Sequence, residues 1–168
     1  NVESLRIASN VITSVVGAGI VVTAPPGVVS RSEITGNVIS YTGAGAAGLL
    51  LTASGSAQTP TEMNSTISYN VIGGSSGDCV TFSLDRALGS LQFFSNSSEN
   101  PSTLVANAGN GLSIKLDNNS DLTATFRNNR FVLNGGHALF LSRDHSSGPC
   151  FESFVAHFHF RPVQGAPL

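Results

Sequence analysis

The sequence predicts an all-β protein that folds as a right-handed parallel β-helix, a solenoid of about five to six coils. Two observations carry this prediction. Five times, a large apolar residue is followed three positions later by asparagine, and these apolar residues are 27, 33, 26 and 33 positions apart. Repeats of this length are typical of solenoids, in which each period forms one coil. In addition, no window of about 11 residues keeps the apolar spacing of an amphipathic helix.

Each repeat is predicted to begin with a strand that runs up to its asparagine. The five pairs are Ile7/Asn10, Ile34/Asn37, Ile67/Asn70, Phe93/Asn96 and Phe126/Asn129. Sharp bends between strands often need a left-handed residue, and asparagine tolerates that conformation better than most residues. We therefore expect the five asparagines to occupy bends, to stack in successive coils and to hydrogen-bond along the axis as an amide ladder.

A second short apolar run follows each bend. The five runs are residues 19–22, 48–51, 79–82, 111–114 and 138–141. Their length and their β-branched residues are typical of strands. After them, residues 150–160 alternate phenylalanine and alanine with polar and β-branched residues, which predicts one more strand. We assign residues 1–149 to the coils and residues 150–168 to a terminal strand and tail.

The repeat resembles the parallel β-helix family, in which I-x-x-N-x-I is followed by G-x-G-I. Here the pattern runs from Ile7 to Ile12 and continues in Gly17-Ala18-Gly19-Ile20. The resemblance covers residues 5–142 and implies the fold. The family includes pectate lyases, polygalacturonases, phage tailspikes, alginate epimerases and autotransporter adhesins, so the resemblance alone does not choose a function.

Composition narrows the classes of partner. Only 11% of the residues are charged and the net charge is −2, so the concentrated basic surface that nucleic acid requires is missing. No apolar stretch reaches the roughly 18 residues of a membrane span. We expect no cofactor. Because the chain begins with Asn1 and carries no leader pattern, we expect a processed, excised or otherwise partial product.

The two cysteines are Cys79 and Cys150. The repeat places Cys79 in the third coil and Cys150 beyond the fifth, at least two strand spacings, or roughly 10 Å, away. A disulfide needs Cα atoms within about 7 Å, so it would form only if the tail folded back. Two buried thiols are the favoured interpretation.

Alignment of the coils reveals a column of acidic residues. Asp85, Asp117 and Asp144 each stand five residues after the second residue of their strand run, and His145 follows the last of them. Successive carboxylates roughly 4.8 Å apart are suited to acid and base roles in glycoside chemistry, to calcium binding or to carbohydrate binding. The alternative is that each aspartate caps its own backbone at a turn.

Metal and nucleophile patterns are weak. His157 and His159 share a face of the terminal strand, but no carboxylate or cysteine stands at ligand spacing beside them, so we predict no metal site. The N-T-D, D-D, G-H-G and R-I-K motifs of polygalacturonases are missing, as is the D-P-H-D signature of alginate epimerases. We assign no catalytic residue.

These observations favour a non-catalytic module of an extracellular or cell-surface protein, of adhesin, passenger-domain, fibre or phage-appendage type. Its expected partners are copies of itself stacked end to end or the remainder of a longer chain, because the end of a parallel solenoid exposes unpaired backbone groups. The alternative is a fragment of a carbohydrate-active lyase, hydrolase or epimerase, or a carbohydrate-binding module, that uses the aspartate column.

Overall fold

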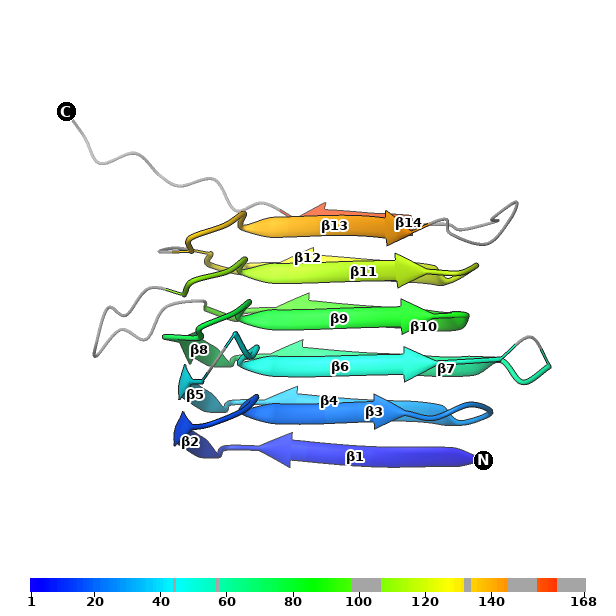
Figure 1. Ribbon diagram of the computed structural model, residues 1–168, viewed down its shortest axis with the longest axis horizontal. Helices are drawn as coiled ribbons and strands as arrows, with labels where there is room; N and C mark the ends of the chain where they lie inside the picture. The colour runs from blue at the N-terminus through cyan, green and yellow to red at the C-terminus, as the bar shows by residue number, and fades with distance from the viewer. Residues whose placement is uncertain (44, 57, 98–106, 132–133, 145–153, 160–168) are drawn as a thin grey trace.

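Parallel strands stacked in layers form the described part of the molecule (Figure 1). The computed structural model describes residues 1–43, 45–56, 58–97, 107–131, 134–144 and 154–159, except for the side chains of Tyr41, Asp144 and residues 154–159. These residues form fourteen strands, and none of them is helical. The all-β prediction is confirmed.

The strands belong to three sheets. The first sheet contains β1 (Val2–Ala8), β4 (Val29–Thr35), β7 (Thr61–Ser68), β10 (Ala87–Phe94), β12 (Asp121–Arg127) and β14 (Phe154–His159). The second contains β3 (Ile20–Ala24), β6 (Leu49–Ser54), β9 (Val80–Asp85), β11 (Leu112–Asp117) and β13 (Leu139–Asp144). The third contains β2 (Val11–Val15), β5 (Val38–Thr42) and β8 (Val71–Gly73). The predicted terminal strand thus lies in the first sheet as β14, parallel to β12.

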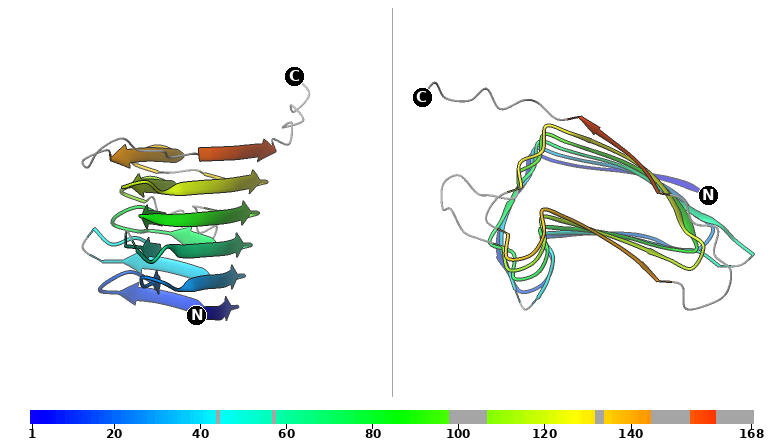
Figure 2. Two further views of the ribbon diagram at one scale, coloured as in Figure 1. Left: turned by 90° about the vertical axis from the view of Figure 1, so that its right-hand side faces the viewer. Right: turned by 90° about the horizontal axis from the view of Figure 1, so that it is seen from above.

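The chain winds as a right-handed coil. Seen from above, it runs anticlockwise through the first, third and second sheets while it rises towards the viewer (Figure 2). The solenoid has about four turns, slightly fewer than the five to six coils predicted. The difference arises because the prediction counted repeats, whereas the five bend asparagines enclose only four complete turns.

Side chains alternate between the inside of the tube and solvent. In β4 the buried positions are Ser30, Ser32 and Ile34, and the residues between them are exposed. Because neighbouring strands pair in register, each inward position forms a column along the axis. One such column consists of Ile7, Ile34, Ile67, Phe93 and Phe126. The apolar residues of the repeat are therefore the core of the tube.

The aromatic part of the core stacks further. The Phe93 ring lies parallel to the Phe131 ring at a centroid distance of 6.0 Å and tilted against the Phe126 ring at 6.3 Å. Phe93 is 1% exposed. Phe131, which follows the fifth asparagine, thus packs into the core although it lies outside any strand.

The five asparagines form a continuous amide ladder at the bend between the first and third sheets. Within it, the backbone N–H and the side-chain Nδ2 of one asparagine both donate to Oδ1 of the asparagine in the next coil. For Asn37 and Asn70 these distances are 3.0 and 2.9 Å, and the same pair of bonds recurs at every step from Asn10 to Asn129. Each amide from the second to the fifth also donates to the carbonyl of the repeat's apolar residue one coil back, as Asn70 does to Ile34 at 2.9 Å.

The left-handed residue of this bend was predicted at the wrong position. It directly precedes the asparagine in every coil, and these residues are Ser9, Gly36, Tyr69, Ser95 and Asn128, with φ between 52° and 65°. The left-handed residue turns the chain just before the asparagine. The asparagine backbone N–H and its Nδ2 then both point along the axis at the Oδ1 atom of the next asparagine. Asparagine is thus required for its two amide donors and its acceptor, and not for left-handed tolerance.

Gly48, which directly precedes β6, is required for a different reason, the close packing of two sheets. A Cβ added at Gly48 would overlap the Ile72 side chain and lie 2.8 Å from the Cys79 carbonyl oxygen. The third sheet approaches the second too closely at this point for a side chain. The G-I part of the repeat therefore reflects packing between two sheets at a corner.

We predict that Asn70→Leu destabilises the protein far more than Asn64→Leu. Asn70 is fully buried, and its replacement by leucine leaves the Asn37 backbone N–H without its acceptor and removes one of the two donors to Asn96 Oδ1. Each orphaned buried group costs about 1–3 kcal/mol, whereas a partly exposed site such as Asn64 changes stability by roughly 0.5 kcal/mol. Urea unfolding of both variants gives the two free energies. Equal losses would contradict the ladder.

Candidate functional site

The aspartate column lies on the outside of the second sheet. Asp85, Asp117 and Asp144 end β9, β11 and β13, and the backbone register pairs each with the next. The alignment of the coils thus places these three residues side by side. Asp144 is described by its backbone only, and His145 lies outside the described residues.

Groups of the protein itself occupy part of this column. The Asp85 carboxylate accepts a 2.8 Å hydrogen bond from the side-chain amide of Asn118, and Arg86 Nε lies 3.8 Å from the same oxygen. The residues after Asp85 and Asp117, which are Arg86 and Asn118, are left-handed, so the chain turns there. Within the described part of the chain, no group of three histidine, cysteine, aspartate or glutamate side chains lies close enough to hold a metal ion.

A second amide corner was not predicted. The backbone N–H of Ser75 donates to Oδ1 of Asn107 at 2.9 Å, and Asn107 Nδ2 donates to Asn134 Oδ1 at 3.3 Å. Asn107 is 1% exposed. The signal is present in the sequence, because Asn107 and Asn134 are 27 residues apart and each stands four residues before the first residue of a strand run. Their function is again to join coils.

The Cys79 thiol is buried beside this corner. Its Sγ lies 3.5 Å from the Ile72 carbonyl oxygen and 3.7 Å from Asn134 Oδ1. Burial, and secondarily the negative charge of Asp78, raises the pKa of the Cys79 thiol well above its ordinary value of 9.0. Since the thiolate is the reactive form, Cys79 is an inert core residue and not a nucleophile. Cys150 lies outside the described residues.

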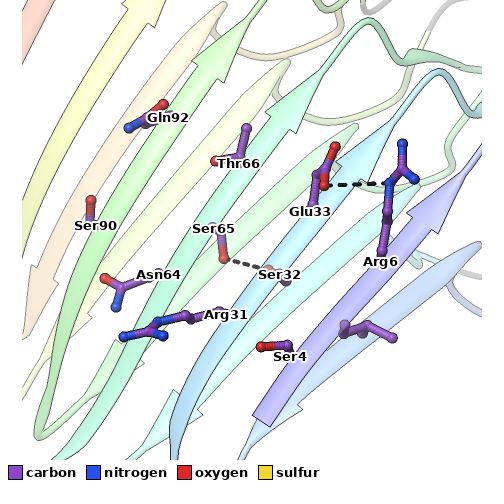
Figure 3. A pocket seen from close by; sticks show the side chains of 11 residues that line it. Ser4, Arg6, Arg31, Ser32, Glu33, Asn64, Ser65, Thr66, Ser90 and Gln92 are labelled. Carbon is purple, nitrogen blue, oxygen red and sulfur yellow. Dashed lines mark hydrogen bonds and ion pairs between the residues drawn. The ribbon is translucent and has the colours of Figure 1, made fainter. Parts of the chain in front are cut away.

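A polar groove crosses the outer face of the first sheet (Figure 3). The second sheet, which carries the aspartate column, lies on the opposite long side of the tube (Figure 2). It has a volume of about 540 Å³. Two outward columns of side chains border it, Ser4, Arg31, Asn64 and Ser90 on one side and Arg6, Glu33, Thr66 and Gln92 on the other. Ser32 and Ser65 lie between the columns, but their side chains are buried and bond to each other, with the Oγ atoms 2.8 Å apart.

Of the two arginines that line the groove, Arg6 forms an ion pair and Arg31 forms none with a described residue. Arg6 Nε lies 3.4 Å from Glu33 Oε2 in an exposed ion pair. Asn64 donates to Glu62 at 2.7 Å. Arg31 extends along the groove towards Asn64 (Figure 3) and makes no ion pair or side-chain hydrogen bond with any described residue. The groove therefore offers one free guanidinium together with several hydroxyl and amide groups.

Two further features of the sequence bear on the site. His157 and His159 lie on β14, whose side chains are outside the described part of the structure, so the prediction that they bind no metal is not tested. The described residues contain no helix of sufficient length and apolarity to cross a membrane.

Comparisons of the chain with protein-family models, with curated protein sequences and with solved structures find no match. The class of protein is therefore defined by the fold alone: a parallel β-solenoid of about four turns.

We predict that Cys79 is protected from thiol reagents until the protein unfolds. In a Cys150→Ser variant, Cys79 should not react with Ellman's reagent at pH 8 and should react fully in denaturant. Because folding raises the pKa of this thiol, the folded state keeps its proton when the unfolded chain loses it, so the free energy of unfolding should fall as pH rises above 9.0. Rapid native-state labelling would show that the thiol is not buried.

Proposed function

We propose that this chain is a non-catalytic structural module of an extracellular or cell-surface protein, of adhesin, passenger-domain, fibre or phage-appendage type. The observation that carries the proposal is the use of buried polar groups. The bend asparagines and Asn107 are 0–4% exposed where they lie in the interior, and their amides bond coil to coil. Such a network stiffens a rod and leaves none of these groups for chemistry.

The rest of the polar surface supports the same role. The chain has few charged residues, and the Asp85 carboxylate is engaged by Asn118 and Arg86. A general acid usually needs a pKa raised by burial or by a close like charge. Asp85 is instead partly exposed and lies beside Arg86.

A carbohydrate-active enzyme fragment is the second candidate, because Asp85, Asp117 and Asp144 lie in register on one face. The lyase, hydrolase or epimerase interpretation needs a substrate groove beside that column. The groove described above lies on the other long sheet, so this candidate has less support than the scaffold.

Incubation with a panel of acidic and neutral polysaccharides tests the proposal. We expect no products from any of them by reducing-end and unsaturated-product assays, for the native protein and for Asp117→Asn alike. Turnover by the native protein that Asp117→Asn abolishes would assign the aspartate column to catalysis and refute the scaffold.

The partners of the module follow from the free sheet edges. β1 and β14 lie at opposite ends of the first sheet, and β3 and β13 at opposite ends of the second. On its outer side, each presents backbone donors and acceptors that pair with no other described strand, and another parallel strand can pair with them. We propose that a second copy or the remainder of a longer chain covers these edges.

Electron microscopy over a concentration series distinguishes these two partners. Copies that stack head to tail should give filaments with a subunit rise of roughly 25–30 Å, the height of six strands. Strictly monomeric particles at every concentration would refute stacking and leave the longer chain as the covering partner.

A further inference from the structure

We propose that the outer face of the first sheet binds an acidic polysaccharide chain in the groove bordered by Arg31 and Gln92, with Tyr69 as an aromatic platform at its edge. This inference adds a ligand to the proposed scaffold and is independent of the aspartate column. A module that binds without turnover fulfils both proposals.

The shape of the groove selects a chain-like ligand. Its two bordering columns take one residue from each of β1, β4, β7 and β10, so the groove runs along the solenoid axis, perpendicular to the strands (Figure 3). Four strands span about 14 Å. An extended polymer can follow such a groove, and each rung presents it with polar side chains.

The charge of the groove selects an anionic ligand. Its lining contains two arginines and one glutamate, in a chain whose net charge is −2. Arg6 is paired with Glu33, which leaves Arg31 without an ion-pair partner among the described residues. A guanidinium binds carboxylate through two parallel hydrogen bonds. One free arginine suits the widely spaced carboxylates of a uronic acid polymer better than the dense phosphates of nucleic acid.

The uncharged lining selects sugar hydroxyl groups. Ser4, Ser90 and Thr66 contribute hydroxyls, and Gln92 contributes an amide that is exposed and makes no side-chain hydrogen bond within the described structure. Hydroxyl and amide groups can both donate and accept, as sugar hydroxyls do. A polar surface of this kind, with little charge, matches a polyhydroxylated chain.

Tyr69 supplies an exposed aromatic surface near the groove. It follows β7 directly, is 63% exposed and has a φ of 56°, which is unusual for a bulky residue. Phe94, at the outward position two residues beyond Gln92, holds the Tyr69 ring edge to face at 5.9 Å. The platform therefore lies about 7 Å beyond the groove along the strands, and its exposed face can pack against the C–H face of a sugar ring.

Isothermal titration calorimetry with a uronic-acid hexasaccharide tests this inference. Maltohexaose serves as the uncharged ligand of equal length, and inorganic polyphosphate as an anion without sugar rings. The variants are Arg31→Ala, Glu33→Gln and Tyr69→Asn, the last of which removes the ring but tolerates the left-handed backbone. Lys115→Ala is the matched control, because Lys115 is an exposed cation on the second sheet. Thermal melting of each variant verifies that it is folded.

We expect binding of the uronic-acid hexasaccharide alone. Arg31→Ala and Tyr69→Asn should each weaken it at least tenfold, Glu33→Gln should strengthen it by releasing Arg6, and Lys115→Ala should leave it unchanged. Absence of binding to the native protein would overturn the inference, as would equal binding of polyphosphate or equal losses in Arg31→Ala and Lys115→Ala. These outcomes are separate from the turnover assay and the microscopy, which test the scaffold.

Discussion

The structure depends on one interaction, the hydrogen bonding of a buried asparagine amide to the asparagine of the next coil. A buried amide that lacks partners is costly, so once one coil places asparagine at this bend, the coils on either side must provide matching groups. In Asn70, Oδ1 accepts two donors from the coil below, while Nδ2 and the backbone N–H donate to the coil above. The ladder therefore fixes the register of every strand that follows it.

Register then determines what each face of the tube can do. Inward positions form apolar columns that change from isoleucine to phenylalanine along the axis. Outward positions on the second sheet bring aspartates together, and those on the first sheet bring Arg6 and Arg31 onto neighbouring strands. Neither outward group exists in a single coil, so both are products of stacking. A scaffold that holds register this firmly can also present a linear binding surface.

The parts of the fold that repeat in the sequence were predictable, and the parts that vary from coil to coil were not. The bend asparagines recur three residues after a large apolar residue, and the strands of the second sheet recur as short apolar runs. The left-handed residue was misplaced because serine, glycine, tyrosine and asparagine occupy it in different coils, so no common residue type marks it. The groove was missed for a similar reason: Arg31, Asn64 and Gln92 share no motif and become neighbours only through the register. The aspartate column was found because the same residue type recurs.

Native-state hydrogen exchange followed by NMR tests the central claim most directly. The backbone amide protons of Asn37, Asn70 and Asn96 are each bonded to a side-chain oxygen rather than to another backbone group. If the ladder holds the coils in register, these three protons should exchange only through global unfolding, with the same free energy as the most protected strands of the core. Exchange of these protons at the rate of loop amides, while the strands stay protected, would show that the coils are held by the sheets alone.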